Sequence, residues 1–428
     1  MSEDIRLAMR QARESSGLAW DEFARRAGFS RPHLRSVENG TRGVTEDVVR
    51  AYDRVLGTGG VFAATLAGRE DPEGSPWTRS GALAALLETS QGAVLDLDRR
   101  RFVVTGGAAL AALTGRWTSA VAAARPVLPT TDAVPKVLAT VANRLEELRH
   151  LGDELGSGTM AQLARNELAL TAQVLKSGRM TGREEDLGLS LAAEAARQVG
   201  WNLFDGDRQA AAERYYALAL RASAAAGDRT TGAYAMSFMA VQHYTVGNPR
   251  DAVSLLETAE AHVGLGATPR MQAMLAARRA RALSKTGDLK SCARALNRAR
   301  DLVGDGPNED DPPFLYWVTP GEVEMIAGSC ALQLRDPQRA LRNFHDGLAA
   351  DYPGDEDHPR LAAIYLARIA EAHVENHDLD EAVDQARYAV RCLGSVDSAR
   401  SSDTLAGVRA KLQAHRGNPK VRDFLQVG

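Results

Sequence analysis

Residues 30–42 contain side chains that can bind a nucleic acid. Arg31, His33, Arg35 and Ser36 fall within one short segment. An arginine guanidinium can donate two hydrogen bonds to guanine or clamp a phosphate, and Ser or His can bond to either. The segment therefore indicates contact with nucleic acid, provided that a helix turns these side chains outward.

The surrounding pattern predicts the short helices that would present this segment. The stretch AWDEFARRAG (residues 19–28) predicts one helix that stops at its final glycine. Ser30 can cap a second helix, which tolerates Pro32 in its first turn. Leu34 and Val37, three residues apart, should then face inward and leave the polar set outside.

Further helices are predicted on either side of this pair. Ile5, Leu7, Ala8 and Ala12 supply the apolar side of a first helix, and residues 44–56 supply one or two closing helices. A short helix, a tight turn with Gly and a second capped helix have the spacing of a helix-turn-helix.

The stretch GLAWDEFARRAGFSRPHLRSVENGTR (residues 17–42) resembles the lambda-repressor-like, or xenobiotic-response-element, helix-turn-helix family. The family usually has a Gln that bonds the DNA backbone where this chain has Trp20, whose indole N–H can still donate to a phosphate. The resemblance implies contact with double-stranded DNA through Trp20, Ser30, Arg31, Pro32, His33, Arg35, Ser36, Asn39 and Arg42. The alternative is a helical bundle used only for dimerisation or protein contact. In its favour, ten arginines against nine acidic residues in 1–56 leave a net charge of only +1.

A different order begins near residue 155. Five segments share a turn followed by a small residue: GDRQAA at Gly206, GNPRDA at Gly247, GDLKSC at Gly287, RDPQRA at Arg335 and HDLDEA at His377. Their separations are 41, 40, 48 and 42 residues. A small residue stands five positions after the start of each segment. The residue seven positions before the start is mostly small, and the residue nine positions after it is mostly large, such as Phe344. A period of this length with only helical pattern predicts a helical solenoid.

These repeats are similar to tetratricopeptide repeats, with longer loops. The similarity spans residues 185–395, and residues 137–178 can form an earlier helical pair. Residues 401–413 read as a capping helix. The resemblance implies an inner wall formed by the first helix of each pair, with ligand-binding positions at Tyr234, Ser237, Tyr244, Arg281, Lys285, Gln333, Glu371 and Glu375. Two cations followed by two carboxylates would suit a short peptide, and the alternative is that these residues form an ordinary solvated face.

Two further segments stand out. The acidic, Pro-rich loop 302–322 ends in FLYW, which can cover the groove or simply pack. The stretch DRRRFVVTGGAALAALTG (residues 98–115) resembles a twin-arginine export signal, but it lies after the predicted DNA-binding head. We interpret it as a connector helix between head and array, with Arg99–Arg101 able to contact acids or phosphate.

Other chemistry has little support in the sequence. The three Cys are far apart, which argues against a disulfide framework or a zinc site and favours a reducing compartment. His373 and His377 lack the metalloprotease order, and no nucleophile elbow, phosphate loop or dinucleotide fingerprint occurs. We therefore expect no enzyme, no metal and no cofactor. A net charge of −3 gives no general drive toward DNA or membranes. No stretch has the roughly 18 to 20 apolar residues of a membrane span, so we expect a cytoplasmic protein without membrane contact.

The combined hypothesis is an all-α protein with three parts: a DNA-binding domain (1–60), a linker with connector helices (61–133) and a repeat domain (134–428). This arrangement resembles Gram-positive regulators that receive a peptide pheromone in quorum sensing, and their long relatives in actinobacteria. By that resemblance the protein is a homodimeric transcription factor modulated by a peptide or small-molecule effector. The alternative is a repeat scaffold that binds another protein and carries a vestigial head.

Overall fold

The computed structural model describes most of the chain, namely residues 2–16, 18–56, 62–63, 75–90, 106–124, 135–151, 155–264, 267–304, 306–350, 359–394 and 398–426. Every regular element within these ranges is a helix, which confirms the all-α prediction. No described helix is long and apolar enough to span a membrane.

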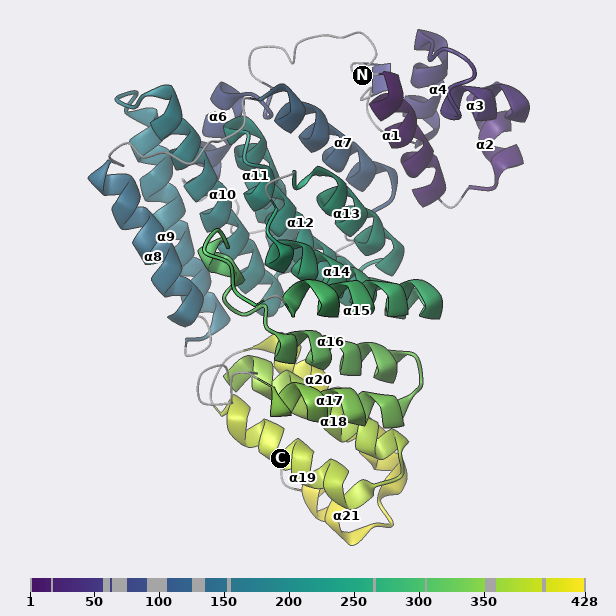
Figure 1. The fold of residues 1–428 in the computed structure, drawn as a ribbon, viewed down its shortest axis with the longest axis vertical. Helices are drawn as coiled ribbons and strands as arrows, with labels where there is room; N and C mark the ends of the chain where they lie inside the picture. The colour runs from purple at the N-terminus through teal and green to yellow at the C-terminus, as the bar shows by residue number, and fades with distance from the viewer. Residues whose placement is uncertain are drawn as a thin grey trace.

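The N-terminal domain contains, in its described residues up to 56, the helices α1 (Ser2–Ser15), α2 (Trp20–Ala27), α3 (Arg31–Glu38) and α4 (Glu46–Leu56) (Figure 1). Gly28 ends α2 with a φ of 77°, a left-handed conformation that costs glycine little. Ser30 caps α3 by accepting a hydrogen bond from the backbone N–H of His33. The predicted stop and cap are therefore both present.

The apolar face of α1 differs from the prediction at one position. Ile5, Met9 and Ala12 are buried in the core of the domain, whereas Leu7 is 49% exposed. The spacing of four and then three residues places the buried set on one face of the helix, and Leu7 lies on another face. The expectation for Leu7 was wrong, because it relied on residue type and ignored the helical period.

Antiparallel helical pairs make up most of the described chain from residue 136 to residue 393 (Figure 1). The earlier pair expected in 137–178 is present as α8 (Lys136–Leu151) and α9 (Ser157–Lys176). The five following pairs are α10 (Gly182–Asp205) with α11 (Gln209–Ala226), α12 (Arg229–Val246) with α13 (Pro249–His262), α14 (Pro269–Thr286) with α15 (Leu289–Val303), α16 (Pro320–Gln333) with α17 (Pro337–Ala349), and α18 (Pro359–Glu375) with α19 (Leu379–Leu393). The predicted capping helix is α20 (Ala399–Leu412), followed by the turn η2 (Gln413–His415) and by α21 (Pro419–Gln426), which sequence reasoning missed.

Small residues allow the two helices of a pair to approach closely. Gly328 on α16 is the clearest case, because a Cβ built there would lie 2.5 Å from a ring carbon of Phe344 on α17. These two residues are the predicted positions seven before and nine after the fourth turn. The first unit keeps this geometry one residue later than predicted, at Gly200 and Tyr216.

The shift in the first unit has a backbone cause. Asp207, and not Gly206, adopts the positive φ of the turn, at 57°. Arg335 and His377 hold the same place in later turns, at 65° and 63°, and Gly287 does so at 80°. Counted from Asp207, the spacings become 40, 40, 48 and 42 residues. The prediction aligned this segment on Gly206, but the residue with positive φ in this turn is Asp207.

Two connector helices, α6 (Arg79–Ser90) and α7 (Ala108–Ala123), join head and array. The stretch that resembles an export signal continues into α7, and Arg99–Arg101 lie outside the described residues. Helix α7 packs against α1 on one side and against α11 and α13 on the other (Figure 1). Trp117 of α7 is completely buried against Gly232 and donates to the Ser223 hydroxyl at 3.1 Å. The segment is therefore a structural bridge.

The array curls until its far end meets α10. The buried carboxylate of Asp205, the last residue of α10, accepts hydrogen bonds from Arg360 on α18 and from Ser398, each at 3.0 Å. Arg400 on α20 lies 3.4 Å from the same carboxylate. These partners are more than 150 positions away in the chain, so their contacts bring the two ends of the array together. The inner faces of the first helices therefore enclose a common space.

Candidate functional site

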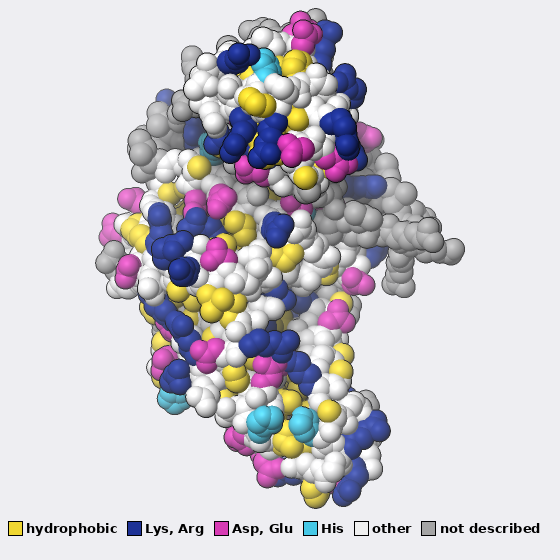
Figure 2. Space-filling view, turned by 90° about the vertical axis from the view of Figure 1, so that its right-hand side faces the viewer, with side chains coloured by type: hydrophobic (Ala, Val, Ile, Leu, Met, Phe, Trp, Pro, Cys, Tyr) yellow, Lys and Arg dark blue, Asp and Glu magenta, His cyan; other side chains and the backbone are white. Residues whose placement is uncertain are grey.

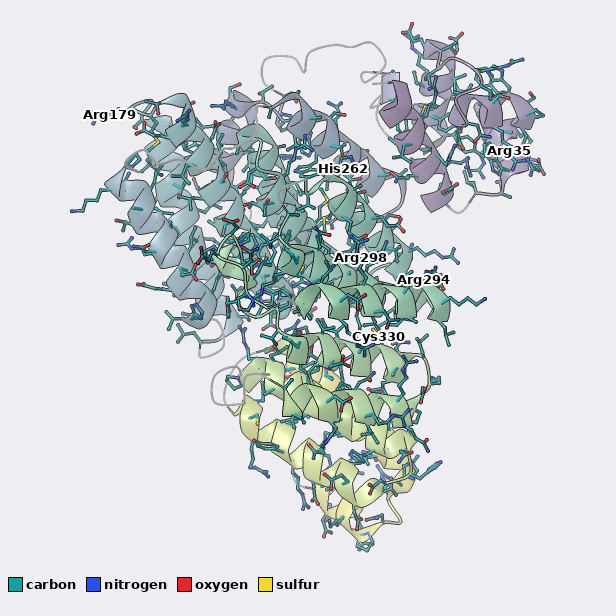
Figure 3. All side chains as sticks on the ribbon, in the orientation of Figure 1. Arg35, Arg179, His262, Arg294, Arg298 and Cys330 are labelled. Carbon is teal, nitrogen blue, oxygen red and sulfur yellow. The ribbon has the colours of Figure 1, made fainter. Side chains whose placement is uncertain are left out.

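Helix α3 presents a polar face to solvent. Leu34 and Val37 are fully buried, whereas Arg31 and Arg35 are exposed. Arg35 lies at the outer edge of the N-terminal domain, away from the array (Figure 3). Arg31 forms a surface ion pair with Asp21 at 3.2 Å, which costs little to exchange for another anion.

A buried polar network fixes α3 from behind. The Glu38 carboxylate accepts two hydrogen bonds from the Arg13 guanidinium, at 2.8 and 2.9 Å, and one from the Tyr52 hydroxyl at 2.8 Å. Glu38 therefore joins the end of α3 to α1 and α4. Trp20 packs against this network, because the centroid of its half-buried ring lies 3.8 Å from the Arg13 guanidinium carbon. Removing one partner of such a buried pair typically costs about 3–5 kcal/mol, so the network holds α3 rigidly.

The other predicted DNA contacts surround the exposed face of α3. Ser30, Pro32, Asn39 and Arg42 are exposed, while His33 and Ser36 are partly buried.

Three of these residues already have protein partners. The His33 ring stacks on Phe29 with centroids 5.3 Å apart, and its Nδ1 lies 2.8 Å from the Arg42 guanidinium. The Asn39 side chain accepts from Arg10 at 2.9 Å. These contacts orient the set around α3 before any ligand arrives. Figure 2 shows several Lys and Arg side chains on this face of the domain, with Asp and Glu side chains among them.

The second candidate site is a cavity of about 440 Å³ inside the curl of the array, which we call the inner cavity. Helices α10, α12, α14, α16, α18 and α20 all contribute to its lining. Of the predicted ligand positions, Tyr234, Tyr244 and Arg281 line it. Ser237 lies behind the wall, where its hydroxyl accepts from Arg278 at 3.0 Å. Lys285 is half-buried and is not part of the lining.

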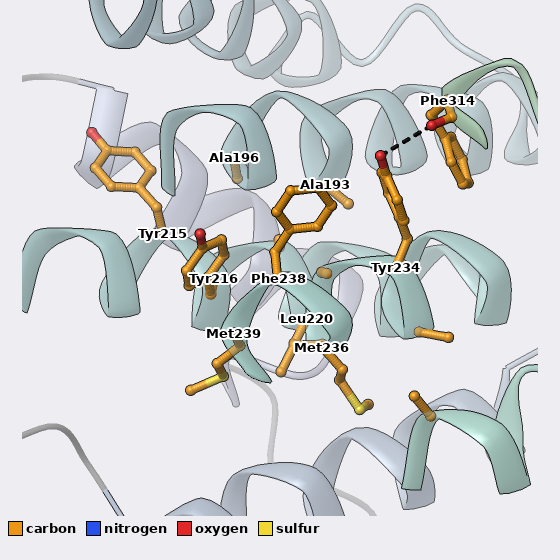
Figure 4. Packing of buried hydrophobic residues seen from close by; sticks show 14 of the residues in the cluster. Ala193, Ala196, Tyr215, Tyr216, Leu220, Tyr234, Met236, Phe238, Met239 and Phe314 are labelled. Carbon is orange, nitrogen blue, oxygen red and sulfur yellow. Dashed lines mark hydrogen bonds between the residues drawn. The ribbon is translucent and has the colours of Figure 1, made fainter. Parts of the chain in front are cut away.

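Aromatic rings form one wall of the inner cavity. Tyr234 stacks on Phe314 with centroids 4.0 Å apart and donates to its backbone carbonyl at 3.1 Å (Figure 4). Phe314 belongs to the short helix η1 (Pro313–Leu315) in the loop singled out from the sequence. Trp317 of the same loop donates to the Tyr234 hydroxyl at 3.4 Å. The loop therefore packs as part of the wall, and its residues Tyr316 and Trp317 also face the cavity.

Two buried acids pair with four arginines around the inner cavity. One is Asp205, described above, which pairs with two of them. The other is Glu194, which pairs with Arg197 at 2.8 Å and with Arg149 at 3.0 Å. Burial alone would raise the pKa of Glu194, but the two guanidiniums outweigh burial and lower it to about 2. These ion pairs are parts of the scaffold. Glu146 also pairs with Arg149, so three carboxylates meet four guanidiniums.

The remaining predicted ligand positions lie in a smaller hollow of about 110 Å³ beside the inner cavity. Gln333, Glu371 and Glu375 line it together with Arg281. Lys411 on α20, which sequence reasoning missed, pairs with both glutamates. The two carboxylates expected to meet a peptide therefore already hold a cation of the chain itself.

Sequence reasoning also missed the inner cavity's own charged groups. Arg278 lies one helical turn before Arg281 on α14, and Arg368 lies across from it on α18. Glu322, between them on α16, is buried and accepts from the Tyr365 hydroxyl at 2.7 Å. Burial raises the pKa of Glu322 to about 7, against the opposing hydrogen bond and nearby guanidiniums. The spacing of three between Arg278 and Arg281 was the available signal for this face of α14.

A family model described as a helix-turn-helix domain matches residues 5–66. No match was found among curated proteins. The chain thus carries an N-terminal helix-turn-helix domain followed by an all-helical domain of paired helices. The helix-turn-helix domain indicates DNA binding and transcriptional regulation.

Proposed function

We propose that this protein is a sequence-specific transcriptional regulator whose α3 enters the major groove of DNA. Its array of pairs, similar to tetratricopeptide repeats, binds a peptide or small-molecule effector that modulates DNA binding. We further propose that the protein acts as a homodimer, so that two copies of α3 read half-sites about one helical turn apart or a multiple of it.

The observation that carries this proposal is the exposed polar face of α3 on a rigid support. Arg31 and Arg35 project from a helix whose opposite side is buried and whose end is fixed by Glu38. Rigid presentation lowers the entropy lost when long side chains bind DNA. Pro32 is exposed on the same helix, so all three side chains are accessible to DNA.

The bridge formed by α7 supports coupling between effector and DNA. One side of α7 contacts α1, the helix that holds Glu38 through Arg13. The other side contacts the array, where the backbone N–H of Gly107 donates to the Asp251 carboxylate at 3.1 Å. A change in the array can therefore reorient the head through one packed helix.

DNA binding by the full-length protein tests the regulator. We would measure binding to a pool of genomic upstream fragments and to random DNA by fluorescence anisotropy, from 50 to 300 mM salt. The double variant Arg31→Ala/Arg35→Ala should lose binding to its selected fragments by at least tenfold, because base-edge contacts are typically worth about 1–3 kcal/mol each.

The matched control is Arg50→Ala/Arg294→Ala, which removes the same charge from exposed sites on α4 and α15. It should retain selective binding. Equally weak and unselective binding by wild type and both variants would overturn the regulator and favour a repeat scaffold with a vestigial head.

A further inference from the structure

The inner cavity contains more positive charge than its scaffold neutralises. Arg278, Arg281 and Arg368 line it, and within the described part of the chain none of them has a carboxylate within 4.0 Å. Their polar partners are hydroxyls: Ser237 at 3.0 Å, Ser284 at 3.0 Å and Ser329 at 2.7 Å, respectively.

This positive charge is costly in a protein interior. Arg278 is only 7% exposed and Arg281 8% exposed, and Arg368 is partly buried. Burial lowers the pKa of Arg278 and of Arg368, and burial with Arg281 and Arg368 lowers the pKa of nearby Lys285 to about 8. The nearby Glu322 carboxyl has a pKa raised to about 7 by burial, so at neutral pH it supplies only part of one negative charge. Buried positive charge in excess of its counter-ions destabilises the fold, so its presence points to an external anion that supplies the missing charge.

Aromatic rings stand beside these guanidiniums. Arg278 lies over the Phe238 ring at 4.1 Å and over the Trp317 ring at 4.9 Å. The Phe238 ring is also in edge contact with Trp201 at 4.9 Å between centroids. Flat apolar surface and fixed guanidiniums thus share one cavity, whose 440 Å³ falls in the range of small-molecule sites.

We propose that the inner cavity binds a compact aromatic anion, with its carboxylate, sulfonate or phosphate group held by Arg278 and Arg368 and its ring packed against Phe238 and Trp317. Guanidiniums match the planar oxygens of such groups, and stacked rings favour a flat ligand. This inference assigns a chemical class to the effector, and it rests on the proposed function for the claim that the ligand is an effector.

Two fluorescent probes that differ by one sulfonate test the proposal on the full-length protein. The anion is 8-anilinonaphthalene-1-sulfonate, and the neutral counterpart is N-phenyl-1-naphthylamine. Wild type should bind the anion at least tenfold more tightly than the neutral probe. The double variant Arg278→Met/Arg368→Met should lose at least tenfold in affinity for the anion and change less than threefold for the neutral probe.

The matched control is Arg294→Met/Arg298→Met, which removes two positive charges from the exposed side of α15 (Figure 3). It should bind both probes like wild type. The Arg278/Arg368 variant should also melt at a higher temperature than wild type without probe, because Met replaces a buried charge with an apolar chain of similar length and the freed hydroxyls of Ser237 and Ser329 keep their backbone bonds.

Equal affinity of wild type for the two probes would overturn the proposal, whether or not the variant folds. Equal loss of both probes in the variant would overturn it too, because a collapsed cavity and not a lost charge would then explain the change. Neither probe measurement involves DNA. If DNA binding fails the test but wild type still prefers the anionic probe, only the regulator is rejected. If DNA binding passes but wild type binds both probes equally, only the anion site is rejected.

Discussion

Replacing Gly328 with Ala tests how the helical pairs are built. The new Cβ would lie 2.5 and 2.6 Å from two ring carbons of Phe344, well inside van der Waals contact. Phe344 is only 1% exposed and cannot move into solvent. Overpacking of this kind typically costs about 1–3 kcal/mol, against a gain of up to about 1 kcal/mol in helix propensity. We expect a net loss of about 1–2 kcal/mol.

Gly407→Ala is the matched control. Gly407 is exposed within α20, and a Cβ built there meets no atom within 4 Å, so the variant should gain about 0.5–1 kcal/mol from helix propensity alone. Thermal unfolding of both variants, followed by circular dichroism at 222 nm, should place Gly328→Ala about 2–8 °C below wild type and Gly407→Ala above it.

A smaller side chain at position 344 should reduce the penalty at Gly328. In a double-mutant cycle, Gly328→Ala should cost less in a Phe344→Leu background than in wild type, because the two side chains compete for one space. If Gly328→Ala melted at or above the temperature of Gly407→Ala, the close approach of α16 and α17 would be refuted.

Three other predictions concern buried ionisable groups. Burial raises the pKa of Glu322 to about 7, so the folded state keeps a proton that the unfolded chain releases. This stabilisation is lost as the pH rises through 7. Glu322→Gln should therefore flatten the fall in Tm between pH 5 and 8, measured by calorimetry. Burial lowers the pKa of His243 to about 4, so stability is lost as the pH falls from 6.5 to 4. His243→Phe should therefore raise Tm more at pH 5 than at pH 8. Equal shifts in Tm at the two pH values would contradict this. Asp205→Ala removes the carboxylate shared by Arg360 and Arg400 and should cost about 3–5 kcal/mol. Hydrogen exchange should then accelerate in α18 and α20, and unchanged exchange there would rule out this closure.

Local patterns predicted the elements of this fold well. Ser30 and Gly28 mark the helix boundaries that they suggest, because caps and left-handed turns depend on neighbouring residues alone. The small residue Gly328 faces Phe344 as its place in the repeat predicts, because each pair packs in the same way. Where a turn tolerates two solutions, as at Gly206 and Asp207, the local pattern could not choose between them.

The charge balance of the inner cavity was not predictable in this way. Arg278 and Arg281 share a face of α14, and that much follows from a spacing of three. Whether each finds a carboxylate depends on helices distant in sequence, as with Asp205, which meets Arg360 155 positions further along the chain. Likewise Lys411, on a helix beyond the repeats, neutralises carboxylates that the inner-wall pattern left open. The repeat period says which side chains face inward, and only the curl of the array says which of them meet.

The segment that resembles an export signal has the composition required for a bridge between the two sites. Gly115 lies beside Ala8 of α1, where a Cβ would make ordinary contact at 3.9 Å, while Trp117 fills the space over Gly232 at the start of α12. Helix α12 continues from Gly232 to Tyr234 and Phe238, which line the inner cavity. Contiguity alone does not transmit a signal, which requires an element with two positions. Because Trp117 is completely buried against a glycine that has no space for even a methyl group, α12 cannot shift relative to α7 without moving it. If an occupant displaces α12, we expect α7 to move with it, and α7 contacts α1 of the helix-turn-helix domain.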